Sequence, residues 1–274
     1  MCRTATVADE WRTRSVTSGR PVRPRHLPAL GDAPPPQTYR DGVVLPTLPA
    51  IERLTLARVT RVPDWHPERG AFQQFPVHAW VVRHPDGAIL VDTGIGEGNE
   101  VIDSWYAPEV VGLREALTSI ELNIDDIAAV VLSHLHFDHC GQQQLLDAPV
   151  FVQAREHREA QRPQYTVPEW ADIPASRLRL VDGDEDIADG VRLVATPGHT
   201  PGHQSVVIET GDTRAVLGAQ CAFRAAEART GEPGATNLHD VSWRAAARDS
   251  LARLRSFGPA TLQLSHDSEV LVFE

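Results

Sequence analysis

Several features that would narrow the choice of function are missing from this 274-residue chain. It contains no lysine, since all 26 of its basic residues are arginine, and this excludes a lysine Schiff base or the lysine of a phosphate-binding loop. No Gly-x-Ser-x-Gly motif occurs, so nothing indicates a serine nucleophile. Three cysteines, Cys2, Cys140 and Cys221, are too few and too scattered for a disulfide framework.

Long apolar runs are also missing. No stretch of about 18 apolar residues occurs, which argues against a transmembrane helix. The N-terminus lacks the apolar segment of a secretory signal peptide. Together with the scarcity of cysteine, these absences lead us to expect a cytoplasmic protein with no membrane partner.

The net charge of −11 is unevenly distributed along the chain. Residues 1–40 hold seven arginines and three acidic residues, a balance of 7 − 3 = +4, so the remainder sums to −11 − 4 = −15. Such an acidic body is unlike a nucleic-acid-binding surface. We therefore expect a small molecule rather than nucleic acid as the partner, and the sequence leaves a homodimer open.

Proline and arginine are abundant in the N-terminal part, which shows no apolar period. We predict that residues 1–41 form a flexible extension and that residues 42–274 form one folded domain. With 42% hydrophobic residues, the chain can bury a sizeable core.

The apolar patterns beyond residue 42 predict strands first and then strands alternating with helices. Two apolar runs around Pro85-Asp86-Gly87 predict a hairpin within residues 75–94. The other predicted elements are helices in 108–122 and 240–258, a buried strand in 127–134, three strands in 191–220 and a last strand in 260–267. This order is typical of an α/β fold in which helices cover packed sheets.

Residues of the kind that bind metals follow predicted strands at five places: Asp92, the cluster 134–139, His199, the region of Gln220, and His266. Such residues converge only where the strand ends share one edge of a sheet. Within the cluster, His134 and His136 can point the same way in an extended segment, whereas Asp138 and His139 can face a second point. The spacing therefore suits two metal ions.

A simpler interpretation is a histidine-rich surface loop, or core histidines that are each satisfied by one hydrogen bond. A single His-x-His pair would fit that interpretation. The cluster, however, places four ligand-type residues within six positions, and further histidines follow later strands. This pattern favours a metal site.

The stretch SHLHFDHCGQ, residues 133–142, resembles the His-x-His-x-Asp-His signature of the metallo-β-lactamase superfamily. Asp92 in LVDTG, His199 in TPGHTPGH and His266 in LSHD stand where the other motifs of that family belong. The resemblance spans about residues 50 to 270, and among branches the motifs most resemble the N-acyl homoserine lactonase-like group. It implies a four-layer αββα sandwich with metal ions at one edge.

The resemblance also implies roles for individual residues. His134, His136 and His199 would bind a first metal ion. Asp138, His139 and His266 would bind a second, with zinc as the expected metal in one or two copies and another transition metal as the alternative. Asp138 would in addition relay a proton. Asp92 would hold the loop and a ligand histidine by hydrogen bonds, and His203 would be a structural hydrogen-bonding residue.

The stretch AVLGAQCAF, residues 215–223, departs from the family pattern. Gln220 stands where most dinuclear members have a bridging aspartate, although its carbonyl oxygen can ligate one ion. With two divalent ions, Asp138 and one hydroxide, the site charge would be +4 − 1 − 1 = +2, against +1 with an aspartate bridge. We predict that Gln220 faces the site and that Cys221 is a small buried apolar residue. Phe223 stands where lactonases of that group tend to have a tyrosine. The tyrosine hydroxyl would help to polarise a lactone carbonyl, and phenylalanine cannot.

These observations predict a zinc-dependent hydrolase of lactonase or esterase type, in which metal-bound hydroxide opens a small carbonyl ester, with a lactone preferred. The alternatives are a thioester, phosphodiester or β-lactam hydrolase on the same scaffold, and a non-catalytic metal-binding or regulatory relative. Aromatic residues are predicted to line the substrate pocket, although ordinary loop packing explains them equally well. These are Trp65, Phe72, Phe75, Trp105, Tyr106 and Phe223.

Overall fold

The computed structural model describes residues 38–40, 43–45, 50–60, 74–234, 237 and 240–274. The chain forms two units, Met1–Thr47 and Leu48–Glu274. In the first unit, β1 (Thr38–Arg40) pairs with β2 (Val43–Leu45) in antiparallel fashion. The second unit contains the candidate metal ligands.

Two β-sheets form the centre of the second unit. The larger has seven strands in the order β6-β3-β4-β5-β7-β8-β9, and the smaller has six, in the order β10 to β15. The larger sheet consists of β3 (Ala50–Val59), β4 (Phe75–Arg83), β5 (Ala88–Val91), β6 (Pro108–Val110), β7 (Ile127–Val131), β8 (Val150–Gln153) and β9 (Leu178–Val181). The smaller consists of β10 (Glu185–Ala188), β11 (Val191–Ala195), β12 (Gln204–Glu209), β13 (Arg214–Ala219), β14 (Ala260–Leu264) and β15 (Leu271–Phe273).

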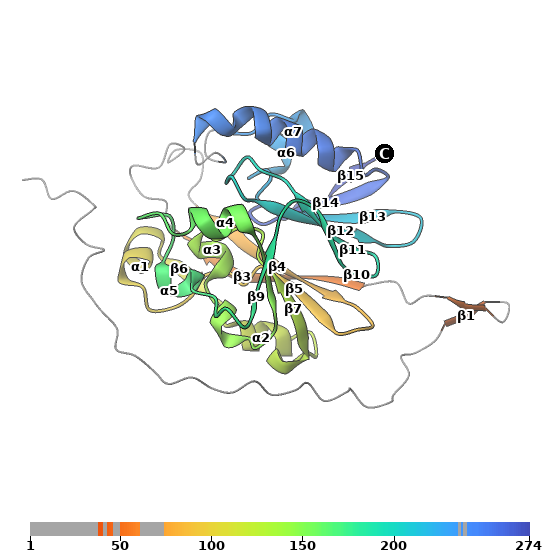
Figure 1. Ribbon diagram of the computed structural model, residues 1–274, viewed down its shortest axis with the longest axis horizontal. Coiled ribbons are helices and arrows are strands. Elements are labelled where there is room, and N and C mark those ends of the chain that lie inside the picture. The colour runs from red at the N-terminus through yellow and green to blue at the C-terminus, as the bar shows by residue number, and fades with distance from the viewer. Residues whose placement is uncertain (1–37, 41–42, 46–49, 61–73, 235–236, 238–239) are drawn as a thin grey trace, which may run out of the picture. The chain divides into compact units, whose positions relative to one another are not determined.

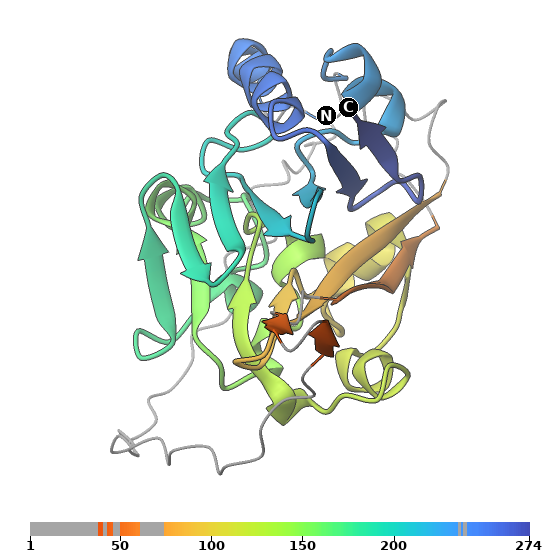
Figure 2. The same ribbon diagram turned by 90° about the vertical axis from the view of Figure 1, so that its right-hand side faces the viewer.

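The described residues also form seven α-helices, most of them short. They are α1 (Glu100–Tyr106), α2 (Leu113–Thr118), α3 (Phe137–Cys140), α4 (Ala154–Glu159), α5 (Pro168–Ala171), α6 (Ala225–Thr230) and α7 (Arg244–Arg255). The two sheets pack against each other and helices cover their outer faces (Figures 1 and 2). Helices α6 and α7 cover the smaller sheet, and α2 packs against β3 of the larger one. This is the four-layer αββα sandwich that the family resemblance implies, and it confirms the predicted α/β fold class.

Alternation along the strands divides the apolar side chains between two cores. Leu217 and Ile208 of the smaller sheet pack with Trp80 of the larger sheet in the core between the sheets. Val216, which precedes Leu217, belongs to the second core, where Leu251 of α7 covers the smaller sheet. Because successive side chains of a strand point to opposite faces, one strand contributes to both cores.

Most of the predicted elements are confirmed: the hairpin of β4 and β5, the strand β7, the three strands β11 to β13, and the helix α7. The helix predicted over 108–122 is wrong at its start. Residues Pro108–Val110 form β6, which pairs with β3, and α2 is confined to Leu113–Thr118. The strand predicted as the last is β14, and β15 follows it at the edge of the smaller sheet.

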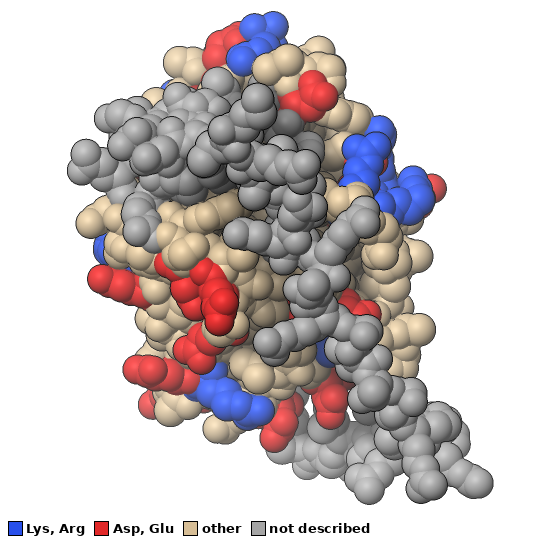
Figure 3. All heavy atoms as spheres, turned by 90° about the vertical axis from the view of Figure 1, so that its left-hand side faces the viewer, with Lys and Arg blue, Asp and Glu red and all other residues tan. Residues whose placement is uncertain are grey.

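On the face in Figure 3, the described arginines lie in separate clusters, with acidic residues also grouped on this face, so they form no continuous cationic strip there. Among the described residues, no helix combines the length and the apolar character that crossing a bilayer requires.

Candidate metal centre

The candidate ligands lie in loops that leave the strands at one edge of the sandwich. Asp92 follows β5 directly, and residues 133–139 follow β7, its parallel neighbour. Gln220 and His266 follow the parallel pair β13 and β14, whereas His199 lies in the loop between β11 and β12. The carboxyl ends of parallel strands meet at a common edge, which is why residues so distant in sequence are neighbours.

Three histidines form the first group. His134 Nε2 lies 3.1 Å from both His136 Nδ1 and His199 Nε2, and those two atoms are 3.0 Å apart. His134 and His199 are buried, and His136 is partly exposed. Nitrogen atoms that bind one tetrahedral zinc ion at about 2.0–2.1 Å are about 3.3–3.4 Å apart, so the triangle has nearly the size that such an ion requires.

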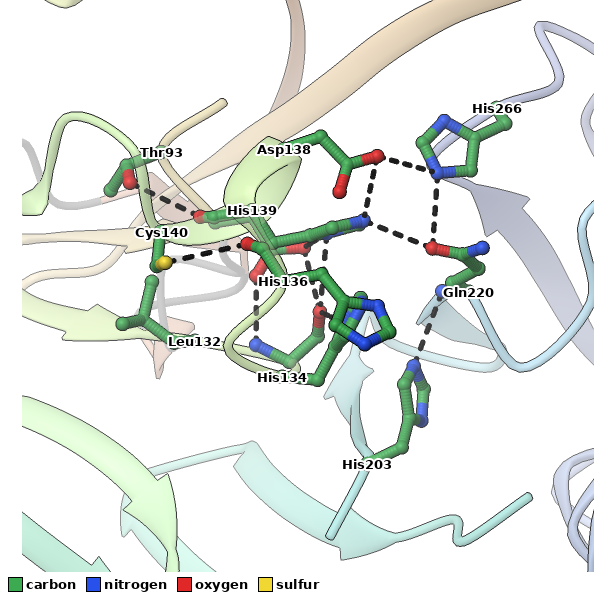
Figure 4. A network of polar contacts seen from close by, with 12 residues as sticks. Thr93, Leu132, His134, His136, Asp138, His139, Cys140, His203, Gln220 and His266 are labelled. Atoms are coloured by element: carbon green, nitrogen blue, oxygen red, sulfur yellow. Dashed lines mark hydrogen bonds and ion pairs between the residues drawn. The ribbon is translucent and has the colours of Figure 1, made fainter. Parts of the chain in front are cut away.

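Asp138, His139 and His266 form the second group, and all three residues are buried. Asp138 Oδ2 lies 3.7 Å from His139 Nε2 and 3.5 Å from His266 Nε2. Gln220 Oε1 lies 3.1 Å from each of these two nitrogen atoms. Figure 4 shows this carbonyl oxygen directed between the two rings. Gln220 therefore reaches the second group, as the sequence predicts.

In three of the histidines, the ring nitrogen that points away from the cluster has a hydrogen-bond partner, and this partner fixes which nitrogen carries the proton. His139 Nδ1 faces the Asp92 carboxylate at 2.8 Å, and the Nδ1 atoms of His199 and His266 each lie 3.0 Å from a backbone oxygen, of Asn237 and Pro76 respectively. Carboxylate and carbonyl oxygens only accept hydrogen bonds, so in the neutral rings Nδ1 carries the proton. The lone pair is then on Nε2, the atom that points into the cluster.

The same holds for His134. The Ser133 hydroxyl donates its proton to Asp92 Oδ2 at 2.8 Å, so it accepts a hydrogen bond from His134 Nδ1 at 3.1 Å. The Nε2 lone pairs of neutral His134 and His199 therefore face each other in the first group, and those of neutral His139 and His266 face the Gln220 carbonyl oxygen in the second. Mutually facing acceptors are unfavourable unless a cation lies between them. The residues present fit a bound metal ion at both groups.

The electrostatic surroundings support the same conclusion. Burial holds the pKa of His134 and of His199 well below the ordinary histidine value, and lowers the pKa of His266 to about 4. Burial alone would also lower the pKa of His139, but the neighbouring carboxylates of Asp138 and Asp92 raise it. His134 and His199 of the first group are thus neutral ligands at neutral pH, as is His266 of the second, whereas the two carboxylates favour positive charge at His139.

Two residues next to the ligands adopt left-handed backbone conformations that are uncommon outside glycine. Asp92 has φ 62° and Ala219 has φ 48°. Asp92 is held by its N–H, which donates to Val131 O at 2.9 Å, and by its carboxylate, which accepts from Ser133 N at 2.7 Å. Ala219 accepts from Ser265 N at 2.9 Å and immediately precedes Gln220. Surrounding hydrogen bonds therefore maintain both strained turns at the site.

After the turn at Ala219, successive side chains point to different environments. Cys221 is 2% exposed and packs with Leu251 in the core beneath α7, where burial raises its pKa to about 12. This agrees with the apolar role predicted for it. His203 donates from Nδ1 to Thr196 and accepts the Gln220 N–H at Nε2, 3.2 Å away. His203 is therefore a structural hydrogen-bonding residue, as predicted.

The predicted pocket aromatics occupy different positions. Trp65 and Phe72 lie outside the described residues. Phe75 and Phe223 are 8% and 5% exposed, and their rings pack against the His266 ring at centroid distances of 5.0 and 4.7 Å. These two residues support a candidate ligand and present little surface to solvent.

Tyr106, at the end of α1, is partly exposed, and its ring packs on the Phe137 ring at a centroid distance of 4.7 Å. Burial and the charge of Asp138 raise the pKa of its hydroxyl. Trp105 is also partly exposed. These two residues remain candidates for contact with a substrate.

Sequence patterns missed two residues that contact candidate ligands on the side away from the cluster, Ser133 and Asn237. Ser133 is adjacent to the motif, so its position could have suggested a role. Asn237 acts through its backbone oxygen, which accepts from His199, and no side-chain pattern could have revealed that contact.

Comparison with known proteins agrees with this architecture. The profile of the metallo-beta-lactamase superfamily matches residues 73–266, and the chain belongs to that superfamily. An N-acyl homoserine lactonase from a Bacillus species is 32% identical over 161 residues, which cover 54% of this chain and 64% of that protein. The chain thus spans less than two thirds of the length of this curated relative.

Solved structures of similar fold include a variant of AiiA from B. thuringiensis with N-decanoyl-L-homoserine bound at its active site. It has a TM-score of 0.67 at 23% identity and covers 81% of this chain and 94% of that one. AidC, described as a dizinc quorum-quenching lactonase, has a TM-score of 0.62 at 18% identity, with 81% of this chain and 89% of that one covered. At such identities these similarities establish the fold.

Proposed function

We propose that the protein is a metal-dependent hydrolase that opens a small carbonyl ester, and that the ester is a lactone. The observation that carries this proposal is the convergence of neutral imidazole lone pairs and one carboxylate at the edge of the sandwich, in the two groups described above. The similarity to N-acyl homoserine lactonases supports the choice of substrate class.

His134, His136 and His199 would hold a first ion, and Asp138, His139 and His266 would hold a second, with Gln220 Oε1 as a further ligand. Neutral imidazole nitrogen in a tetrahedral arrangement suits zinc, so zinc is the metal we propose. When bound, such ions supply a water molecule of lowered pKa and polarise a substrate carbonyl.

Asp138 is the residue to which we assign proton transfer. Its Oδ2 atom faces the two histidines of the second group, and the residue is 8% exposed. The other carboxylate oxygen, Oδ1, can accept the proton released by the attacking water. Asp138 would then return this proton to the alkoxide oxygen of the opened ring, so that one water and one lactone give one hydroxy acid.

Hydrolysis of a generic lactone after metal removal tests the proposal. Treatment with a strong chelator should abolish hydrolysis of N-hexanoyl homoserine lactone, and added zinc should restore it. Full activity in metal-free protein would refute metal dependence. A parallel panel of a thioester, a phosphodiester and a β-lactam tests the substrate class, since faster turnover of one of these would refute the lactone assignment alone. A zinc-loaded protein that hydrolyses nothing would indicate a binding protein.

A further inference from the structure

A buried carboxylate lies behind the first group of histidines. Glu156, in the first turn of α4, is 0% exposed and is the only glutamate among the described residues that is buried. Glutamate is rarely buried in full unless its charge is compensated. The proton-transfer scheme above does not use this residue.

Glu156 contacts both loops that supply the three histidines. Its Oε1 atom accepts a hydrogen bond from the N–H of Leu135, the residue between His134 and His136, at 2.9 Å. Its Oε2 atom accepts from the hydroxyl of Thr200, the residue after His199, at 2.6 Å. One carboxylate therefore connects the His-x-His segment to the loop of the third histidine.

Two further contacts extend this connection. The Tyr165 hydroxyl donates a hydrogen bond to Glu156 Oε1, and the Tyr165 ring packs on the His136 ring at a centroid distance of 4.8 Å. A Cβ added to Gly202 would lie 2.2 Å from the backbone nitrogen of Glu156. The loop of His199 is therefore pressed directly onto the start of α4, and only glycine permits this approach.

The charge of Glu156 also bears on the site. Burial raises its pKa, while hydrogen bonds from Thr200, Tyr165 and Leu135 oppose that effect. The three histidines are neutral ligands, so a divalent ion bound by them brings an uncompensated positive charge into a buried region. A carboxylate that accepts a hydrogen bond from the ligand loop would offset part of that charge.

We propose that Glu156 is a positioning residue of the first metal site, which holds His134 and His136 at a fixed separation from His199. This inference rests on the proposed function only in that the three histidines bind a metal ion. It assigns Glu156 no contact with the substrate or with the ion.

Cobalt affinity measured at each site separately tests the inference. In a His266→Ala background only the first site is complete, and in a His199→Ala background only the second is complete. Adding Glu156→Gln should weaken cobalt binding about 10- to 100-fold in the first background, because the amide carries no charge and its nitrogen cannot accept the hydrogen bonds that the carboxylate receives. In the second background the affinity should change less than about twofold, since Glu156 contacts neither Asp138 nor His139 nor His266.

Glu159→Gln is the matched control. Glu159 lies on the same helix, is partly exposed and is paired with Arg162 at 2.8 Å, and its substitution removes the same charge. It should leave cobalt affinity unchanged in both backgrounds. Tyr165→Phe and Thr200→Val retain Glu156 and remove one hydrogen-bond donor each. Both should weaken cobalt binding at the first site alone, and they test the inference if Glu156→Gln does not fold.

The possible outcomes separate the two proposals. If the parent protein binds cobalt at the first site and Glu156→Gln, Tyr165→Phe and Thr200→Val all leave that affinity unchanged, the inference is wrong and the proposed function stands. Equal weakening at both sites would also refute it, because a general loss of structure then explains the result. A parent protein that binds no cobalt at the first site would refute the proposed function and this inference together.

Discussion

Gln220 shows how one side chain can change the electrostatics of a metal centre. Its Oε1 atom lies 3.1 Å from both His139 Nε2 and His266 Nε2, so its position is that of a ligand. An amide oxygen, however, carries no net charge, so among the candidate ligands only Asp138 supplies negative charge to offset the repulsion between two divalent ions. We expect the second ion to be held more weakly than the first for this reason.

Gln220→Asp should therefore raise occupancy of the second site, because the added carboxylate lowers the site charge by one unit. We expect the zinc content after exposure to equal, limiting zinc to move from about one ion towards two per chain. Elemental analysis of the purified proteins measures this. Gln161→Asp, at an exposed position of the same chain, provides a control for the added charge. Two tightly bound ions in the unsubstituted protein, with no gain in the variant, would mean that another ligand completes the site.

The candidate ligands were easier to predict than the residues that lie behind them. His134, His136, Asp138 and His139 stand in one dense motif directly after a buried strand, and the motif itself indicates their chemistry. Glu156 is a single acidic residue in the first turn of a short helix, a place where acidic residues are common for other reasons. Its role depends on loops that are distant in sequence, so no local pattern could reveal it.

At the scale of secondary structure elements, the sequence-based predictions were correct where local patterns decide the conformation. They were wrong where pairing with a distant strand decides it. The strands β11, β12 and β13 were predicted correctly because apolar runs and turn residues mark their limits. The segment 108–122 has helical spacing, yet its first residues form β6, since Val110 pairs with Ala57 of β3. Backbone pairing at a sheet edge leaves little trace in side-chain periodicity.

Helix α3, which carries Asp138 and His139, depends on a close backbone approach at its end. A Cβ added to Gly141 would lie 2.0 Å from the nitrogen of Gly96 and 2.5 Å from the carbonyl carbon of Ile95. Gly141 itself has φ −66°, so alanine would suffer no backbone strain there. The requirement for glycine is steric, and it joins α3 to the loop after β5.

Gly141→Ala should consequently reduce the free energy of unfolding by about 1–3 kcal/mol or more, because this is the usual cost of overpacking. It should also weaken metal binding at the second group, because α3 would shift. Gly112→Ala is the matched control, since Gly112 has φ −62° and no atom within 4 Å of an added Cβ. We expect that variant to stay within about 1 kcal/mol of the parent protein. Chemical denaturation compares the two, and equal stabilities would show that the backbone approach at Gly141 is not required.

At the scale of the whole molecule, the candidate site lies at an edge where two separate sheets both contribute residues. His134, Asp138 and His139 follow the larger sheet, whereas Gln220 and His266 follow the smaller one. The apolar core that includes Trp80 and Leu217 fixes the sheets relative to each other, and thereby the separation of the two sets of ligands. The geometry of the metal centre is thus a consequence of packing across the layers.

The N-terminal segment should be dispensable for this architecture. The predicted boundary at residue 41 falls inside the pairing of β1 with β2, so the better place to shorten the chain is after Thr47, where the second unit begins. All the candidate ligands lie beyond that point. A protein consisting of residues 48–274 should melt cooperatively within about 4 °C of the full chain, a shift that corresponds to about 1 kcal/mol, and should bind the same amount of zinc. Circular dichroism and elemental analysis of both proteins measure these quantities. If the shortened protein loses its cooperative transition, residues 1–47 contribute to the stability of the folded unit or of an assembly, and the segment is not an extension.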